Sequence, residues 1–148
     1  MDRNEALLAL DAVGKTDRKM AEKMRWPMWY HASFGLAEGL IVTGLASEEI
    51  GTTAVAGGVA MIGLLTWQTR KSGMFVSGFR GGRSRPLTYG IIAFLLAAIV
   101  VAFKVVRDHP QETQLAVGLG AIVTLVLTLA SLWWERIYRR EVREGGLA

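Results

Sequence analysis

Residues 68–86, QTRKSGMFVSGFRGGRSRP, determine how the rest of this chain is arranged. This stretch carries five Lys and Arg side chains and no acidic residue, and it separates two pairs of long apolar segments. Short loops that are rich in Lys and Arg stay on the cytoplasmic side of a membrane, because basic residues resist translocation. The stretch therefore predicts a cytoplasmic loop, and it fixes the orientation of the apolar segments on either side.

The composition favours the same class of protein. Of the 148 residues, 51% are hydrophobic and 20% are charged. The charges gather in residues 1–26, in the central loop and in residues 135–148, so they are segregated from the apolar segments. Such segregation is typical of membrane proteins. The formal net charge of +4 then reflects this asymmetry, and no nucleic-acid partner is expected.

Four apolar segments are expected to cross the membrane, at residues 27–47, 50–67, 86–106 and 115–134. Each has about 20 residues, enough to cross ~30 Å of hydrocarbon at ~1.5 Å per residue. The turn after residue 47 and the loop at 107–114 are short, so each pair of segments forms an antiparallel hairpin. The sequence thus predicts an all-α integral membrane protein with four transmembrane helices, arranged as two antiparallel hairpins within a domain at 27–134.

The basic and aromatic residues predict where the termini lie. Of the 17 Lys and Arg residues, Lys104 and Arg107 lie on one side of the predicted membrane and the other fifteen lie on the side of the central loop. The loop side also carries all five tryptophans, which are Trp26, Trp29, Trp67, Trp133 and Trp134. Aromatic belts of this kind lie at membrane–water interfaces. We therefore expect a multi-pass protein of the cell (inner or plasma) membrane with both termini in the cytoplasm.

The two ends of the chain are expected to be helical. Residues 1–26 combine mixed charges with a narrow apolar stripe at Leu7, Leu10 and Val13, which indicates an amphipathic lead-in that is cytoplasmic or interfacial. Residues 135–148 continue the fourth span as a charged cytoplasmic tail.

Glu38 is the ionisable residue nearest the middle of a predicted span. Carboxylates are costly at that depth and usually face a bundle interior or a cavity, so Glu38 is a candidate functional residue. Thr124 of the fourth span is expected at the same level, which predicts a small polar site with Thr124 or a backbone carbonyl as hydrogen-bond partner. The alternative is a protonated Glu38 that only joins helices. His31 lies two turns before Glu38, and an interfacial position is favoured over a proton relay because ~10.5 Å separates the two residues along the helix.

Glycines predict where helices approach closely. Gly35 and Gly39 have the four-residue spacing that lets helix backbones come together, and Gly57 and Gly58 of the second span are expected at a similar depth.

The central loop is a candidate for contact with anionic lipid headgroups or phosphate. Its cations stand among glycines, and they are Arg70, Lys71, Arg80, Arg83 and Arg85. Glycine exposes backbone amides and arginine donates in pairs, although the spacing of a phosphate-binding P-loop is absent. A loop that only determines topology is the alternative.

In outline the chain resembles the small multidrug resistance transporters. The resemblance rests on four predicted spans, a short chain and a lone carboxylate in the first span within Ala37-Glu38-Gly39. It implies a transport role for Glu38. The lead-in, the long basic loop and the absence of aromatic residues around the acid differ from that family.

These features favour a protein that is not an enzyme. The absence of cysteine excludes thiolate catalysis, and no catalytic set, metal-ligand spacing or cofactor motif is found. The first hypothesis is an accessory or scaffold subunit, or a small homo-oligomer, that acts by association with other membrane subunits or with copies of itself. The alternative is a proton- or cation-coupled small transporter or channel that uses Glu38.

Overall fold

The protein is built from long helices. The computed structural model describes residues 12, 15, 25–72, 82–109 and 112–144. The elements in this part of the chain are α2 (Met28–Ala46), α3 (Thr52–Ser72), α4 (Arg85–Val101), the π-helical segment η1 (Ala102–Val106) and α5 (Glu112–Arg143). No strand occurs among these residues. The predicted all-α class, with four long helices, is confirmed.

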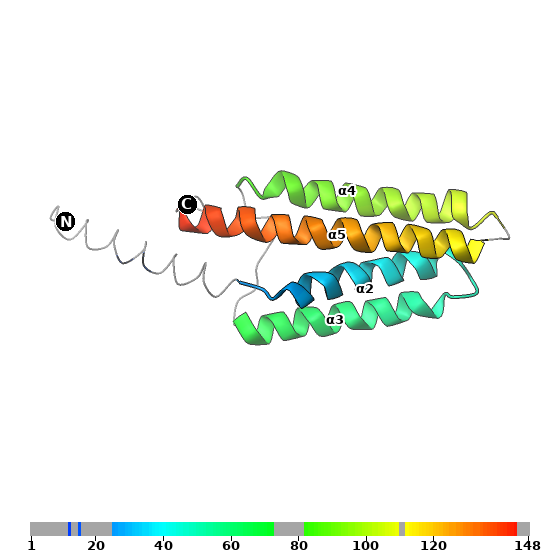
Figure 1. Ribbon diagram of the computed structural model, residues 1–148, viewed down its shortest axis with the longest axis horizontal. Coiled ribbons are helices and arrows are strands. Elements are labelled where there is room, and N and C mark those ends of the chain that lie inside the picture. The colour runs from blue at the N-terminus through cyan, green and yellow to red at the C-terminus, as the bar shows by residue number, and fades with distance from the viewer. Residues whose placement is uncertain (1–11, 13–14, 16–24, 73–81, 110–111, 145–148) are drawn as a thin grey trace.

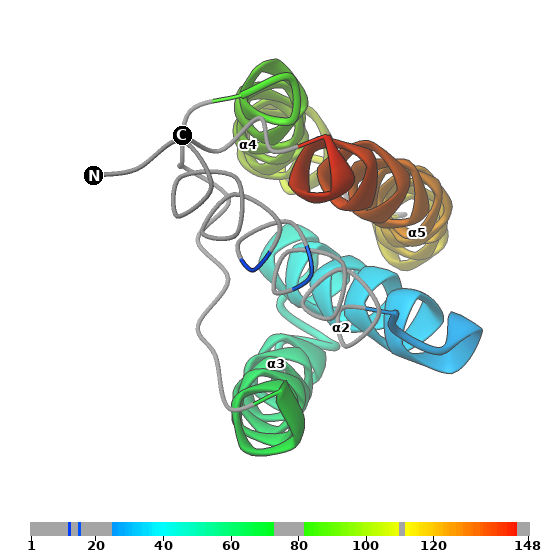
Figure 2. The same cartoon turned by 90° about the vertical axis from the view of Figure 1, so that its left-hand side faces the viewer.

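The helices run side by side along one axis (Figure 1). Helices α2 and α3 are antiparallel, and so are α4 and α5. Viewed along the axis, they form a bent row in the order α4, α5, α2, α3 (Figure 2). Helix α2 packs against α5 and α3, and α4 with η1 packs against both α5 and α2, reaching α2 mostly through η1. The arrangement is therefore open on one side.

The apolar core lies between α2, α4, η1 and α5. Its eight buried residues are Val42, Ala46, Ala98, Ala102, Val106, Ala116, Val123 and Leu127. Six further side chains, partly buried, pack against them. Helix α3 supplies neither kind of residue, so it is attached to the core only through α2.

Two helical segments are long and apolar enough to cross a membrane, Arg85–Val106 and Thr113–Arg143. Only 17% and 22% of their apolar windows are buried within the protein, whereas a core helix of a soluble protein is mostly buried. Helices α2 and α3 do not meet the same criterion. The first contains His31 and Glu38 and the second ends in polar residues, so their apolar stretches are diluted.

Several boundaries differ from those expected. Helix α3 continues to Ser72, so Arg70 and Lys71 lie in its last turn rather than in a loop. Cations are favourable at a helix C-terminus, where the helix dipole is negative. Helix α5 continues to Arg143, as expected of a helical tail. Nearly all of the lead-in and Arg80 lie outside the described residues.

A carboxylate of α5 holds the start of α4. Glu141 accepts hydrogen bonds from the backbone N–H of Arg83, from the backbone N–H of Ser84 at 3.1 Å and from the Ser84 hydroxyl at 2.8 Å. Pro86 follows within the first turn of α4, where a missing N–H costs nothing. The contact fixes the end of α5 beside the beginning of α4.

Candidate functional site

The contact between α2 and α5 is a close approach of two backbones. A Cβ atom added to Gly39 would lie 2.0 Å from Thr124 Oγ1 and 2.6 Å from the carbonyl oxygen of Gly120. A Cβ atom on Gly35 would lie 2.5 Å from the carbonyl oxygen of Thr124. Neither position has room for a side chain, so the glycines set the distance between the helices. We call these residues, with Gly120, the glycine seam.

Thr124 of the glycine seam and Thr43, which lies beside Gly120, both donate their hydroxyls within their own helices. Thr43 donates to the carbonyl of Gly39 at 2.8 Å, and Thr124 donates to the carbonyl of Gly120 at 2.9 Å. The structure contains no hydrogen bond between Thr124 and Glu38, so the expected pairing of these two residues is not made. The physical reason is that a helical threonine can always reach the carbonyl four residues earlier.

The two glycines of α3 have different surroundings. A Cβ atom on Gly57 would lie 2.5 Å from the carbonyl oxygen of Ala37, so this glycine packs against α2. Gly58 has open space where its Cβ atom would be, and the close packing expected of it is not made within this chain. One residue turns a helix by about 100°, which moves Gly58 away from α2.

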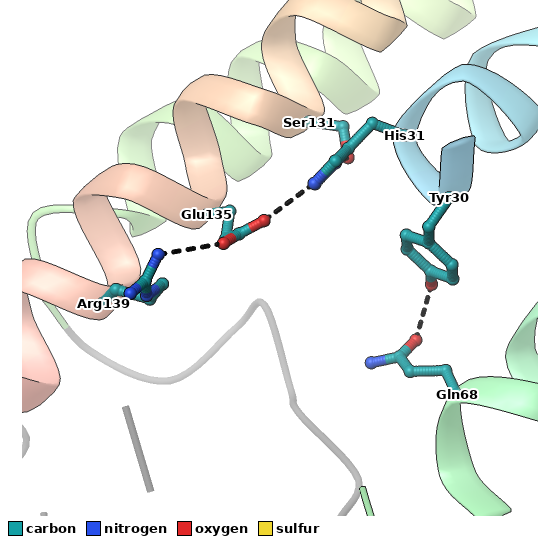
Figure 3. Close-up of polar contacts among 6 residues, drawn as sticks. All are labelled: Tyr30, His31, Gln68, Ser131, Glu135 and Arg139. Carbon is teal, nitrogen blue, oxygen red and sulfur yellow. Dashed lines mark hydrogen bonds and ion pairs between the residues drawn. The ribbon is translucent and has the colours of Figure 1, made fainter. Parts of the chain in front are cut away.

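His31 joins α2 to α5 through a buried polar cluster (Figure 3). Its side chain is fully buried, with Nδ1 2.8 Å from Ser131 Oγ and Nε2 2.7 Å from Glu135 Oε2. The other carboxylate oxygen of Glu135 accepts from Arg139 at 3.3 Å. We call these four residues the histidine cluster. His31 is thus buried against α5, with partners on both ring nitrogens, and the interfacial depth expected for it stays a prediction.

The cluster balances its charges internally. Glu135 is hydrogen-bonded to His31 through one oxygen and accepts from Arg139 on the other, so both oxygens of the buried side chain have partners. Such pairing is what makes a buried charge tolerable. A signal was present in the sequence, since Ser131, Glu135 and Arg139 are spaced by four residues and must share one face of a helix. Nothing in the sequence indicated that His31 meets that face.

Aromatic rings surround the histidine cluster. Trp26 stacks on Trp134 with ring centroids 6.0 Å apart, and Trp134 stacks on Tyr138 at 4.8 Å. The ring of Trp26 also lies 6.1 Å from that of His31. Tryptophan prefers the membrane–water interface, so these rings are suited to separating the cluster from headgroups and water.

A second polar contact links α2 to α3 at the same end. The Tyr30 hydroxyl donates to Gln68 Oε1 at 2.7 Å (Figure 3). The rings of Tyr30 and Trp67 stack at 5.8 Å, and Trp29 meets Trp67 edge to face at 4.7 Å. The α2–α3 contact is therefore aromatic and partly exposed at this end.

Ser131, His31 and Glu135 also have the functional groups of a hydrolase triad. Catalysis by such a triad needs backbone or side-chain donors aimed at the oxyanion. Ser131 lies in the interior of α5, where each backbone N–H is used by the helix itself. The backbone N–H of Ser131 is therefore not available to stabilise an oxyanion.

Glu38 stands apart from these contacts. It is half-buried on α2 and has no hydrogen bond or ion pair with any other residue that the structure describes. His31 engages α5 instead, so the structure does not bring the two expected site residues together.

The described loop cations do not converge on one point. Arg83 pairs with Glu144 at 3.4 Å on the surface, and the Arg85 side chain donates to the Tyr89 hydroxyl. Lys71 lies over the ring of Trp67 at 4.7 Å. Arg70 is exposed at the end of α3. Arg80 and the glycines Gly78 and Gly81 lie outside the described residues, so the predicted lipid or phosphate contact of the loop stays a prediction.

Comparison of the chain with protein-family models, with curated proteins and with solved structures finds no match in any of the three. Among the described residues, no three His, Asp or Glu side chains are grouped as a metal ion would require.

Proposed function

We propose that this chain is a small four-span membrane protein that acts by association, with copies of itself or with other membrane subunits, and that α3 provides the contact surface. The observation that carries the proposal is the position of α3 at the end of the helix row, where it packs against α2 but contributes nothing to the core.

The outward face of α3 is suited to a second helix. Val55, Val59 and Ile62 are 69%, 65% and 67% exposed, and Gly58 lies among them one turn from Val55 and Ile62. Gly58 has open space above it, so a partner backbone can approach there. Moving an apolar side chain from lipid into a helix interface gains little free energy, because both surroundings are apolar. Close approach of helix backbones is therefore a main source of helix association in membranes.

The internal pairing of polar groups supports membrane spans at α2 and α3. His31 and Thr43 of α2 are buried and hydrogen-bonded, so they need not meet lipid. Thr66 and Thr69 of α3 donate to carbonyls of their own helix. Apart from Glu38, these polar groups of α2 and α3 are therefore satisfied inside the protein.

Single cysteines test the proposal cleanly, because the chain has none of its own. Val59→Cys is expected to form a disulfide between copies, or with a co-purifying subunit, when native membranes are oxidised. Leu125→Cys on the exposed face of α5 is the matched control and should stay uncrosslinked. Adding Gly58→Leu to Val59→Cys should abolish the disulfide-linked product, while the helical content of the protein stays the same. Equal crosslinking at both positions, or crosslinking that survives Gly58→Leu, would refute an α3 interface.

A second function, proton- or cation-coupled transport through Glu38, is favoured by one observation. The role of simple interhelical hydrogen bonding requires a partner, and Glu38 has none among the described residues. A half-buried carboxyl without a partner remains able to take up a proton or cation. In proteoliposomes, Glu38→Gln should abolish ion-driven uptake. The control is Glu48→Gln, which changes an exposed carboxylate just after the end of α2 and should leave uptake unchanged. Wild-type liposomes without ion-dependent flux would eliminate this alternative.

A further inference from the structure

We infer that the last turns of α5 carry a binding site for anionic lipid headgroups, formed by Arg136, Arg140 and Arg143 next to Trp133. The inference rests on the membrane-spanning part of the proposed function. It places the lipid contact on α5 rather than in the central loop.

The four residues share one face of the helix. Their spacing of three, four and three residues forms a continuous stripe, and all four side chains are exposed. The opposite face of the same turns is buried, at Glu135, Tyr138, Glu141 and Val142. The arginine stripe therefore points away from the protein.

Every described carboxylate at this end is engaged elsewhere. Glu135 is held by His31 and Arg139, and Glu141 accepts from Ser84 and the backbone of Arg83. Glu144 pairs with Arg83. The acids are thus used to join helices, and among the described residues none neutralises the arginine stripe.

The length of α5 places the stripe at headgroup depth. Its 32 residues extend for ~48 Å, longer than the ~30 Å hydrocarbon core. Trp133 is 60% exposed, as expected of an anchor at the interface. The arginines follow it by three to ten residues, or ~4.5 to ~15 Å along the axis. Arginine binds phosphate oxygens in pairs, so lipid phosphates fit this layer.

Among the described residues, the other end of the molecule has no comparable stripe of exposed arginines. There Arg107 pairs with Glu48, and Glu49 accepts from Thr113. In the sequence that end carries four acids, Glu48, Glu49, Asp108 and Glu112, against the two bases Lys104 and Arg107. Anionic lipid is therefore expected to bind at one leaflet only.

The test compares two triple variants by native mass spectrometry in neutral detergent. Arg136→Gln/Arg140→Gln/Arg143→Gln removes the stripe, and Arg25→Gln/Arg70→Gln/Lys71→Gln removes three exposed cations from the same end. Phosphatidylglycerol should bind the wild type and the control, whereas the stripe variant should lose about 100-fold in affinity, because the losses of about fivefold for each of the three arginines multiply. Phosphatidylcholine should bind all three forms equally weakly.

Two results would overturn the site. An equal loss in both variants would mean a diffuse charge effect, and displacement of the lipid by equimolar inorganic phosphate would mean a phosphate site. Alkaline extraction of native membranes distinguishes a failure of the lipid-site proposal from a failure of the proposed membrane spans. Release of the wild type would refute the membrane spans themselves, whereas retention with equal losses would refute only the arginine stripe.

Discussion

Helix α2 contacts α5 and α3 in different ways. Against α5 it has the glycine seam along its middle and the buried histidine cluster at one end. Against α3 it has Gly44 and Gly57 in close contact and a partly exposed aromatic group at one end. In a membrane, packing and satisfied polar groups replace the hydrophobic effect between helices. The comparison indicates that α2 and α5 form the stable centre, while α3 is the more weakly held helix.

The largest effect is expected from breaking the glycine seam. In Gly39→Val the new Cβ atom meets Thr124 Oγ1 and the backbone of Gly120, and the backbone cannot move aside without separating α2 from α5. We expect a loss of about 3 kcal/mol or more in the free energy of unfolding. SDS titration in mixed micelles, followed by circular dichroism, measures it.

Gly118→Val on α5 is the matched control, because the same side chain enters open space away from the proposed α3 interface. Its unfolding free energy should change by no more than about 0.5 kcal/mol. Similar losses of unfolding free energy in the two variants would show that the close α2–α5 packing at Gly39 does not account for the effect.

The next effect is expected from the histidine cluster. His31→Ala leaves Glu135 buried with Arg139 alone, and Ser131 loses its partner. We expect a loss of about 2 to 4 kcal/mol, since one half of a buried pair remains uncompensated.

A double-mutant cycle isolates the pair. Glu135→Ala combined with His31→Ala should cost less than the sum of the single losses, by at least about 1 kcal/mol. Arg83→Gln, which breaks an exposed pair with Glu144, should cost no more than about 1 kcal/mol. Strict additivity of the two cluster variants would contradict a coupled site.

The smallest effect is expected at the α2–α3 contact. Tyr30→Phe removes only the hydroxyl that donates to Gln68, and the stacked ring remains. We expect a loss of about 0.5 to 1.5 kcal/mol in the same unfolding assay. A loss as large as that of His31→Ala would reverse the ranking of the two contacts.

Much of the secondary structure could be predicted from the sequence, because the length of each apolar segment and the polar, glycine or proline residues that bound it are visible in the sequence. Glycine spacing within α2 likewise identified a face for close packing. Which helix meets that face could not be predicted, since Gly39 and Gly120 are 81 positions apart and many glycine pairs were available. The choice of Gly57 over Gly58 depends on a rotation of about 100°, which no depth count along a helix can resolve.

The polar site illustrates the same limit. The expected pairing of Glu38 with Thr124 used depth alone, but a hydrogen bond also requires that both side chains point at each other. Thr124 finds a carbonyl in its own helix, while His31 finds Ser131 and Glu135 on another.

The sequence by itself determined that the chain is helical, that its helices are long and that its cations gather at one end, because helix periodicity, apolar length and loop charge are local properties. Only the tertiary structure decided that His31 is buried against Glu135 and that Glu38 has no described partner. It also decided that α3 stands at the edge of the helix row. These outcomes depend on the rotation of each helix about its own axis, and that rotation is set only when the helices pack.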